Sequence, residues 1–261
     1  MATFLSDGVT IAYDDIQPPG WRGAIVLAHG YSSNRNEGWR RTGWYQAFER
    51  RRIRCIALDQ RGHGESEKLY DPAAYGRENM ASDVLALMDH LELDSADMFG
   101  FSMGTRTALQ AALDAPDRVT NLILAGVGGK LLDPSPPPPG GMTMAEAMLA
   151  EDVESIHPEM LKSFRHFADE QGEDRKALAA ASRSSSPRFD VAAIQALPMP
   201  ALVVAGQYDE GAGDPEDLAA MFGEGYGVTI PGCDHFSIIT HGILKASVFD
   251  FLDGTMAFER R

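Results

Sequence analysis

The sequence has little cysteine, no long apolar run and no excess of positive charge, and each shortage excludes a class of protein. Two cysteines, Cys55 and Cys233, are too few for a disulfide framework or a cysteine metal site. Because no run of about 18 apolar residues occurs, we expect no transmembrane helix. The 38 acidic residues outnumber the 23 Lys and Arg, and the net charge of -15 repels nucleic acid and anionic membrane surfaces.

The remaining composition is typical of a globular enzyme. Hydrophobic residues make up 44% of the 261 residues and charged residues 23%, which is enough for one large domain with a small additional module. The sequence starts without a basic leader followed by an apolar segment, so a soluble cytoplasmic protein is expected. The histidines show no metal-ligand spacing with cysteines or carboxylates, and we therefore expect neither a metal nor a cofactor.

The apolar periodicity predicts an α/β fold. Residues 3–15 alternate around Asp7-Gly8 as two antiparallel strands would. Short unbroken apolar runs then predict strands buried on both faces of a parallel sheet, at 24–30, 53–59, 96–102, 119–126 and 200–206. Helical patterns lie between and after these runs, at 44–52, 78–91, 103–115, 215–222 and 238–252. This alternation favours a doubly wound, mostly parallel sheet.

One segment interrupts the alternation. It opens with a proline- and glycine-rich stretch at 126–141, for which polyproline geometry is expected, and continues with helical patterns. These patterns cover 142–150, 158–170 and 173–183. Because the strand pattern resumes at Pro200, we interpret 127–189 as a helical cap inserted into a core of 1–126 and 190–261. A disordered insertion is the alternative, but the apolar side chains of the segment need burial. The cap residues expected to contact substrate are Met144, Met148 and Phe164.

Ser102 is the candidate nucleophile. It lies between Gly100 and Gly104, after a predicted strand and before a predicted helix. Such a serine can be an ordinary turn residue, but a tight turn here also exposes its hydroxyl beside the free N–H groups of the helix. A serine hydroxyl additionally needs a base and a group that orients the base. Asp209 and His235 each follow a later predicted strand, and the carboxyl ends of parallel strands meet at one edge of the sheet.

Asp209 has three rivals among the acidic residues of these loops: Glu210, Asp214 and Asp234. Asp209 is favoured because it occupies the first turn after a buried strand, whereas Asp214 precedes a proline and an acidic helix start, as a helix cap does. Three further residues are interpreted as structural and not catalytic, namely His29, His63 and Cys233.

The chain resembles the serine hydrolases of the α/β-hydrolase fold superfamily. The matching stretches are AHGY (28–31), DQRGHGES (59–66), GFSMG (100–104), GQYD (206–209) and GCDHF (232–236). They occur in the family's order and span nearly the whole chain outside the cap. The resemblance implies that Ser102 is the nucleophile, His235 the general base and Asp209 the residue that orients it. It also implies an oxyanion hole formed by the backbone N–H groups of Tyr31 and Met103.

The sequence departs from some branches of that superfamily. Thr105 stands where many relatives have a third glycine, and the HGGG motif of the hormone-sensitive-lipase-like esterases is absent. The serine at the nucleophile position disfavours epoxide hydrolases and haloalkane dehalogenases. We therefore expect hydrolysis of a small or medium carboxylic ester or lactone through an acyl-serine. The alternatives are hydrolysis of a carbon–carbon bond in a diketone-like aromatic breakdown product, and a non-catalytic ligand receptor on the same fold.

Overall fold

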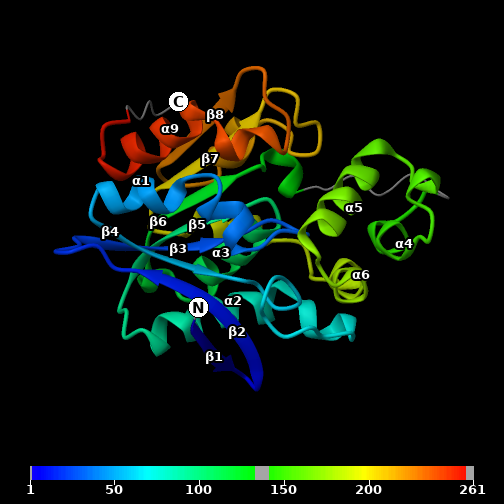
Figure 1. Ribbon diagram of the computed structural model, residues 1–261. Coiled ribbons are helices and arrows are strands. Elements are labelled where there is room, and N and C mark those ends of the chain that lie inside the picture. The colour runs from blue at the N-terminus through cyan, green and yellow to red at the C-terminus, as the bar shows by residue number, and fades with distance from the viewer. Residues whose placement is uncertain (1, 133–140, 257–261) are drawn as a thin grey trace.

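The computed structural model describes residues 2–132 and 141–256, and a single sheet forms the centre of this part (Figure 1). Its strand order is β1-β2-β4-β3-β5-β6-β7-β8. The strands are β1 (Ala2–Ser6), β2 (Val9–Ile16), β3 (Gly23–Ala28), β4 (Ile53–Leu58), β5 (Ala96–Phe101), β6 (Val119–Ala125), β7 (Ala201–Gly206) and β8 (Gly225–Ile230). Strands β3 to β8 run parallel, whereas β1 and β2 are antiparallel to their neighbours. The predicted fold class is therefore confirmed.

The first two strands form the predicted hairpin. Asp7 and Gly8 both have positive φ, at 47° and 80°. Two positive φ values in a two-residue turn match the right-handed twist of the flanking strands, which is why Asp-Gly is favoured there. The pairing of Ser6 with Val9 closes the hairpin at this turn.

Helices cover both faces of the sheet (Figure 1). Alternate residues of each buried strand point to opposite faces, so Ile25 and Leu27 of β3 pack with one set of helices and Val26 with the other. The first set is α1 (Trp44–Arg50) and α9 (Gly242–Leu252). The second set is α2 (Arg77–His90), α3 (Met103–Asp114) and α8 (Pro215–Ala219). The unbroken apolar runs of the strands are thus explained by burial on both sides.

The predicted helix at 238–252 is in fact two elements. A 3₁₀ turn at Ser237–Thr240 comes first, and α9 then begins at Gly242. The break falls at His241, whose extended backbone leaves the helical region and whose Nδ1 accepts a hydrogen bond from the Ile243 N–H at 3.2 Å. A residue that caps a helix in this way stops the preceding turn from continuing. The predicted helix at 215–222 likewise ends earlier, at Ala219.

Shorter elements complete the described chain. A π-helical turn spans Asn36–Arg40. The 3₁₀ turns not yet mentioned are Pro72–Tyr75, Pro116–Arg118, Gly129–Leu131 and Val153–Ser155. None of the helices within 2–132 and 141–256 is both long and apolar enough to cross a membrane.

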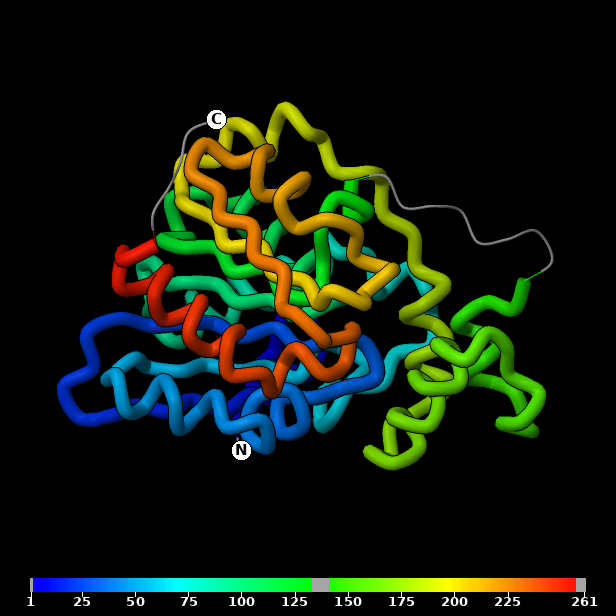
Figure 2. Tube along the Cα trace, turned by 90° about the horizontal axis from the view of Figure 1, so that it is seen from above, coloured from blue at the N-terminus to red at the C-terminus, as the bar shows by residue number. Residues whose placement is uncertain are grey.

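Three helices of the interrupting segment lie to one side of the sheet, beyond the two helical layers (Figures 1 and 2). They are α4 (Met144–Leu149), α5 (Glu159–Gln171) and α6 (Arg175–Arg183), close to the predicted helical patterns. We call these three helices the cap helices. A further helix, α7 (Val191–Gln195), was not predicted and leads back to β7. Most of the predicted polyproline stretch, residues 133–140, lies outside the described residues.

Candidate active site

Ser102 occupies a strained turn between β5 and α3. Its backbone angles, φ 54° and ψ -115°, lie in a region that residues with a side chain rarely adopt. Both neighbouring glycines are needed for this turn. A Cβ on Gly104 would lie 2.0 Å from the carbonyl oxygen of Ala28, and one on Gly100 would lie 2.4 Å from the carbonyl oxygen of Gly104. The turn thus presses α3 against β3 and lifts the Ser102 hydroxyl above the sheet edge.

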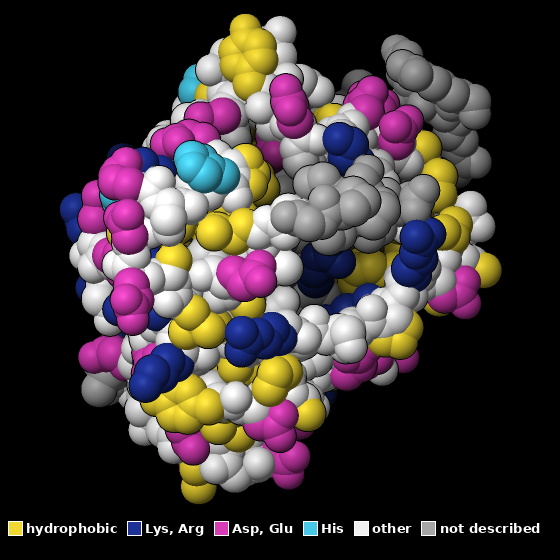
Figure 3. Space-filling view, turned by 90° about the vertical axis from the view of Figure 1, so that its right-hand side faces the viewer, with side chains coloured by type: hydrophobic (Ala, Val, Ile, Leu, Met, Phe, Trp, Pro, Cys, Tyr) yellow, Lys and Arg dark blue, Asp and Glu magenta, His cyan; other side chains and the backbone are white. Residues whose placement is uncertain are grey.

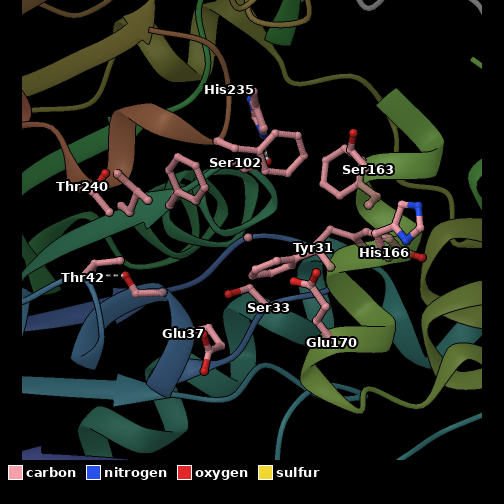
Figure 4. Close-up of a pocket in the computed structure, with 17 residues that line it drawn as sticks. Tyr31, Ser33, Glu37, Thr42, Ser102, Ser163, His166, Glu170, His235 and Thr240 are labelled. Carbon is pink, nitrogen blue, oxygen red and sulfur yellow. Dashed lines mark hydrogen bonds between the residues drawn. The ribbon is translucent and has the colours of Figure 1, made fainter. Parts of the chain in front are cut away.

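The three predicted catalytic side chains meet. The Ser102 hydroxyl and His235 Nε2 are 2.8 Å apart, and His235 Nδ1 lies 2.6 Å from Asp209 Oδ2. Ser102 and His235 face each other at the top of the cavity in Figure 4. Asp209 is only 8% exposed, so its carboxylate is held out of bulk water beside the imidazole. With Nδ1–H donating to Asp209, Nε2 is free to accept the serine proton.

The rival acids have other partners. Asp214 accepts the Glu216 N–H at 3.0 Å and caps α8, as its position before the proline predicted. Asp234 accepts hydrogen bonds from the side chain and the N–H of Ser237, and these bonds hold its pKa below the usual range. Glu210 offers its carbonyl oxygen to the Lys130 ammonium group at 2.6 Å. Of these four acids, Asp209 is the one whose carboxylate hydrogen-bonds to the His235 imidazole.

His29 and His63 are fully buried, and neither forms a hydrogen bond with Ser102 among the described residues. Burial lowers the pKa of His29 to about 4 and that of His63 to about 3, so both imidazoles are neutral at pH 7. His29 Nδ1 lies 2.8 Å from the Gly30 carbonyl oxygen, and its Nε2 accepts the Gln60 N–H at 3.0 Å. This placement fits the structural role expected for both, because the bonds of His29 fix the loop that carries Tyr31.

The two residues predicted to supply the oxyanion N–H groups lie close to Ser102: Met103 follows it in the chain, and Tyr31 lines the same cavity. Met103 is the first residue of α3, so its N–H has no acceptor within that helix. Tyr31 follows β3 by three residues and lines the same cavity as Ser102. Among the described residues, no hydrogen bond occupies either N–H. Thr105 is buried, and its hydroxyl donates to the Ser102 carbonyl oxygen, so it fits within α3 without disturbing the turn.

A cavity of about 490 Å³ opens over Ser102 and His235. Four segments enclose it: the chain after β3, the end of β5 with Ser102, helix α5 and the loop after β8 (Figure 4). The wall is mainly apolar, and it is formed by Tyr31, Phe101, Phe164, Phe167, Phe236 and Ile239. Glu37, His166 and Glu170 lie at a more polar end of the cavity, away from the serine (Figure 4).

Of the three cap residues predicted to contact substrate, Phe164 alone lines this cavity. Phe164 lines the cavity, with its ring centroid 6.1 Å from that of His235. Met148 is fully buried against α5 and α6, and Met144 packs beside it, so neither residue lines the cavity. Met144 and Met148 therefore lie outside the wall of this cavity, contrary to the position expected for residues that contact substrate there. Both lie on α4, which packs against the other two cap helices and not over the serine.

Sequence reasoning missed most of the face that α5 presents to the cavity. That face consists of Ser163, Phe164, His166, Phe167 and Glu170. Residues three, four and seven apart share one side of a helix, so the spacing from Ser163 to Glu170 was a usable signal. The pattern alone does not say which of several cap faces is turned toward Ser102.

The chain belongs to the alpha/beta hydrolase fold family, which residues 23–154 match. The curated relatives align only in part, because the chain covers between 35% and 45% of the length of the first three. One of them is the uncharacterized hydrolase YugF of Bacillus subtilis, which is 32% identical over 49% of this chain and 45% of its own.

Solved structures align over almost the whole length. The enol-lactonase from Burkholderia xenovorans superposes with a TM-score of 0.74 and 22% identity, over 97% of this chain and all of its own. Est816, described as an N-acyl homoserine lactone degrading enzyme, superposes with a TM-score of 0.73 and 25% identity, over 98% of this chain and all of its own. These superpositions support the fold across the segment that the family match leaves out.

Proposed function

We propose that this protein is a serine hydrolase that cleaves a small or medium carboxylic ester or lactone through an acyl-serine intermediate. The observation that carries the proposal is the hydrogen-bonded series Ser102–His235–Asp209, at 2.8 and 2.6 Å, beneath an apolar cavity. The cavity volume of about 490 Å³ lies within the range typical of small-molecule sites. The two solved structures described above belong to proteins whose titles name a lactonase and a lactone-degrading enzyme, which agrees with the proposal.

In the first half of the reaction, His235 Nε2 removes the hydroxyl proton while the Ser102 oxygen attacks the carbonyl carbon. The carbonyl oxygen becomes an oxyanion, which the N–H groups of Tyr31 and Met103 stabilise. The proton then passes from Nε2 to the departing alkoxide oxygen, and the ester C–O bond breaks. Asp209 keeps the proton of Nδ1 in place and stabilises the imidazolium that forms.

In the second half, water takes the place of the alcohol. His235 removes a proton from this water, the resulting oxygen attacks the acyl carbon, and the bond to Ser102 breaks as the proton returns to the serine. The rings of Phe101 and Phe164 lie beside His235, with centroids 5.6 and 6.1 Å from its own. An apolar surrounding of this kind strengthens the electrostatic interactions of the reacting groups.

A matched pair of serine variants tests the proposal, because Ser163 lines the same cavity as Ser102. Ser102→Ala is expected to abolish labelling by a fluorophosphonate probe and to lower turnover of short-chain 4-nitrophenyl esters or lactones by roughly 10⁴-fold or more. Ser163→Ala, on α5 and outside the hydrogen-bonded series, should retain labelling and most of the activity. Wild-type protein that takes no label would favour the receptor alternative. Labelling with turnover of ring-cleavage diketones but of no ester or lactone would favour carbon–carbon bond hydrolysis.

A further inference from the structure

A second cavity, of about 360 Å³, lies on the other side of Tyr31, whose side chain borders both cavities. It is enclosed by the N-terminal parts of α2 and α3 and by the chain that follows α6. Among its described lining residues there are two arginines, four serines and no Asp or Glu. This composition is unexpected in a chain with 38 acidic residues and a net charge of -15. On the side of the molecule where the cap helices lie, basic side chains also border a hollow (Figure 3).

Arg106 is the central feature of this cavity. It lies on α3, four residues after Ser102, and within the described part of the chain its guanidinium has neither a carboxylate partner nor a hydrogen bond. The Arg106 side chain is exposed to solvent, while desolvation by the surrounding protein and the nearby positive charge of Arg77 both lower its pKa from the ordinary value. A guanidinium that faces a like charge and has no carboxylate partner is stabilised by any anion that binds beside it.

Arg77 is held rigidly at the same cavity. Its Nε donates to Gln110 Oε1 at 2.7 Å, its guanidinium stacks on the Phe189 ring at 3.9 Å, and it also donates to the Pro187 carbonyl oxygen. Its carboxylate partner, Glu78, lies 3.5 Å away with a half-exposed side chain. Arg77 therefore contributes a fixed positive charge that a surface ion pair only weakly offsets.

The end of α6 and the chain that follows it supply hydroxyl groups. Ser182 and Ser184 donate to carbonyl oxygens of the preceding helical turn, at 3.0 and 2.7 Å. The Ser185 hydroxyl forms no hydrogen bond with any of the described residues. It is therefore available as a donor on the wall of the cavity.

We propose that this second cavity binds a carboxylate or phosphate group of a small molecule, with Arg106 as the main contact and Arg77 as the second. Planar guanidinium groups bind both kinds of anion through paired hydrogen bonds. Arg106 lies four positions after Ser102, which corresponds to about 6 Å along a helix axis. Two sources fit this chemistry: the acidic end of a substrate whose ester lies at Ser102, and a separate small anion. The first source rests on the proposed function, and the second does not.

Direct binding tests the site without reference to catalysis. Inorganic phosphate and glutarate are titrated separately into the wild-type protein and into Arg106→Gln by calorimetry, at constant ionic strength. We expect at least one of the two anions to bind, and Arg106→Gln to weaken that binding by roughly tenfold to a hundredfold. Arg50→Gln, which removes the same charge from the exposed end of α1, should bind as the wild type does.

Two further variants keep the test decisive if Arg106→Gln folds poorly. Arg106→Lys keeps the charge and should retain part of the affinity, whereas Ser185→Ala should weaken binding by a smaller factor. Equal affinity in the wild type and in all cavity variants, or no binding of either anion at millimolar concentration, would overturn the proposal.

Paired esters then identify the source of the anion. The 4-nitrophenyl esters of butyrate and of glutarate differ by a terminal carboxylate. If the cavity takes the acidic end of a substrate, Arg106→Gln should raise KM for the glutarate ester by tenfold or more and leave the butyrate ester nearly unchanged. If the cavity takes a separate anion, Arg106→Gln should change KM equally for the two esters and should still lose the binding of phosphate or glutarate. An inactive protein that binds the anions through Arg106 would refute the proposed function alone.

Discussion

The Tyr31 hydroxyl donates a hydrogen bond of 2.8 Å to the carbonyl oxygen of Leu178, and it thereby joins the loop after β3 to helix α6. The same tyrosine separates the two cavities and carries a proposed oxyanion N–H group. Burial raises the pKa of this hydroxyl, so it remains a donor across the physiological pH range. A single side chain therefore fixes both the reactive loop and the position of a cap helix.

Tyr31→Phe is expected to loosen the cap helix without removing any group proposed to react. Loss of one buried neutral hydrogen bond should lower the free energy of unfolding by about 0.5–1.5 kcal/mol. Amide hydrogen exchange of α6 should become faster. The control is Tyr226→Phe, which removes an exposed 2.7 Å bond to Glu224 at β8. Equal protection of α6 in the wild type and in Tyr31→Phe would show that the bond does not restrain the cap.

Gly104→Ala tests the close packing behind the nucleophile. The new methyl group would lie 2.0 Å from the Ala28 carbonyl oxygen, so α3 must move away from β3. We expect a loss of stability of about 2 kcal/mol or more, measured by urea unfolding, together with loss of turnover because Ser102 moves with the helix. Gly223→Ala, whose new methyl group would have no atom within 4 Å, should lose far less stability. Similar losses in the two variants would contradict the packing argument.

Much of this arrangement is predictable from the sequence, for a physical reason. Strands buried on both faces have unbroken apolar runs, and the residues that follow them must gather at one sheet edge, which places Ser102, Asp209 and His235 together. The glycines in the motifs around these residues permit the tight turns that the residues occupy. The fold and the reactive residues therefore follow from local patterns.

The cavity wall does not follow from local patterns. Phe164 and Met148 both lie on amphipathic cap helices, and only the docking of α5 against Tyr31 and Phe236 turns the first toward Ser102. The stop at His241 is also set by context, because an imidazole caps a helix only where its ring faces the next N–H. Such outcomes depend on tertiary packing, which the apolar periodicity of a single segment does not specify.

Phe164→Ala and Met148→Ala should separate the lining of the cavity from the interior of the cap. Phe164→Ala enlarges the cavity and should change the ranking of esters with different acyl lengths, measured as kcat/KM across the series. Met148→Ala creates a hole between cap helices and should cost about 2–5 kcal/mol of stability while leaving the ranking unchanged. A changed ranking in Met148→Ala together with an unchanged one in Phe164→Ala would reverse the assignment.

The buried histidines predict acid sensitivity. Burial lowers the pKa of His63 from 6.5 to about 3, so the unfolded chain binds a proton in a pH range where the folded protein does not. The stability present above pH 6.5 is therefore lost as the pH falls toward 3. For one histidine the loss between pH 7 and 5.5 is about 1 kcal/mol. Urea unfolding of His63→Gln should show a smaller loss than the wild type by this amount, and equal losses would count against a buried neutral His63.

One comparison of variants tests most directly which carboxylate is the acid of the proposed triad. Of Asp209 and Asp234, the former hydrogen-bonds to the His235 imidazole at 2.6 Å, whereas the carboxylate of the latter is held by Ser237. Asp209→Asn keeps the size and shape of the side chain but favours the wrong tautomer of the His235 imidazole. The kcat on one ester substrate should therefore fall by roughly 10³- to 10⁴-fold. Asp234→Asn and Glu210→Gln, measured beside it, should each lose much less. A larger loss in either of these two variants than in Asp209→Asn would contradict the triad.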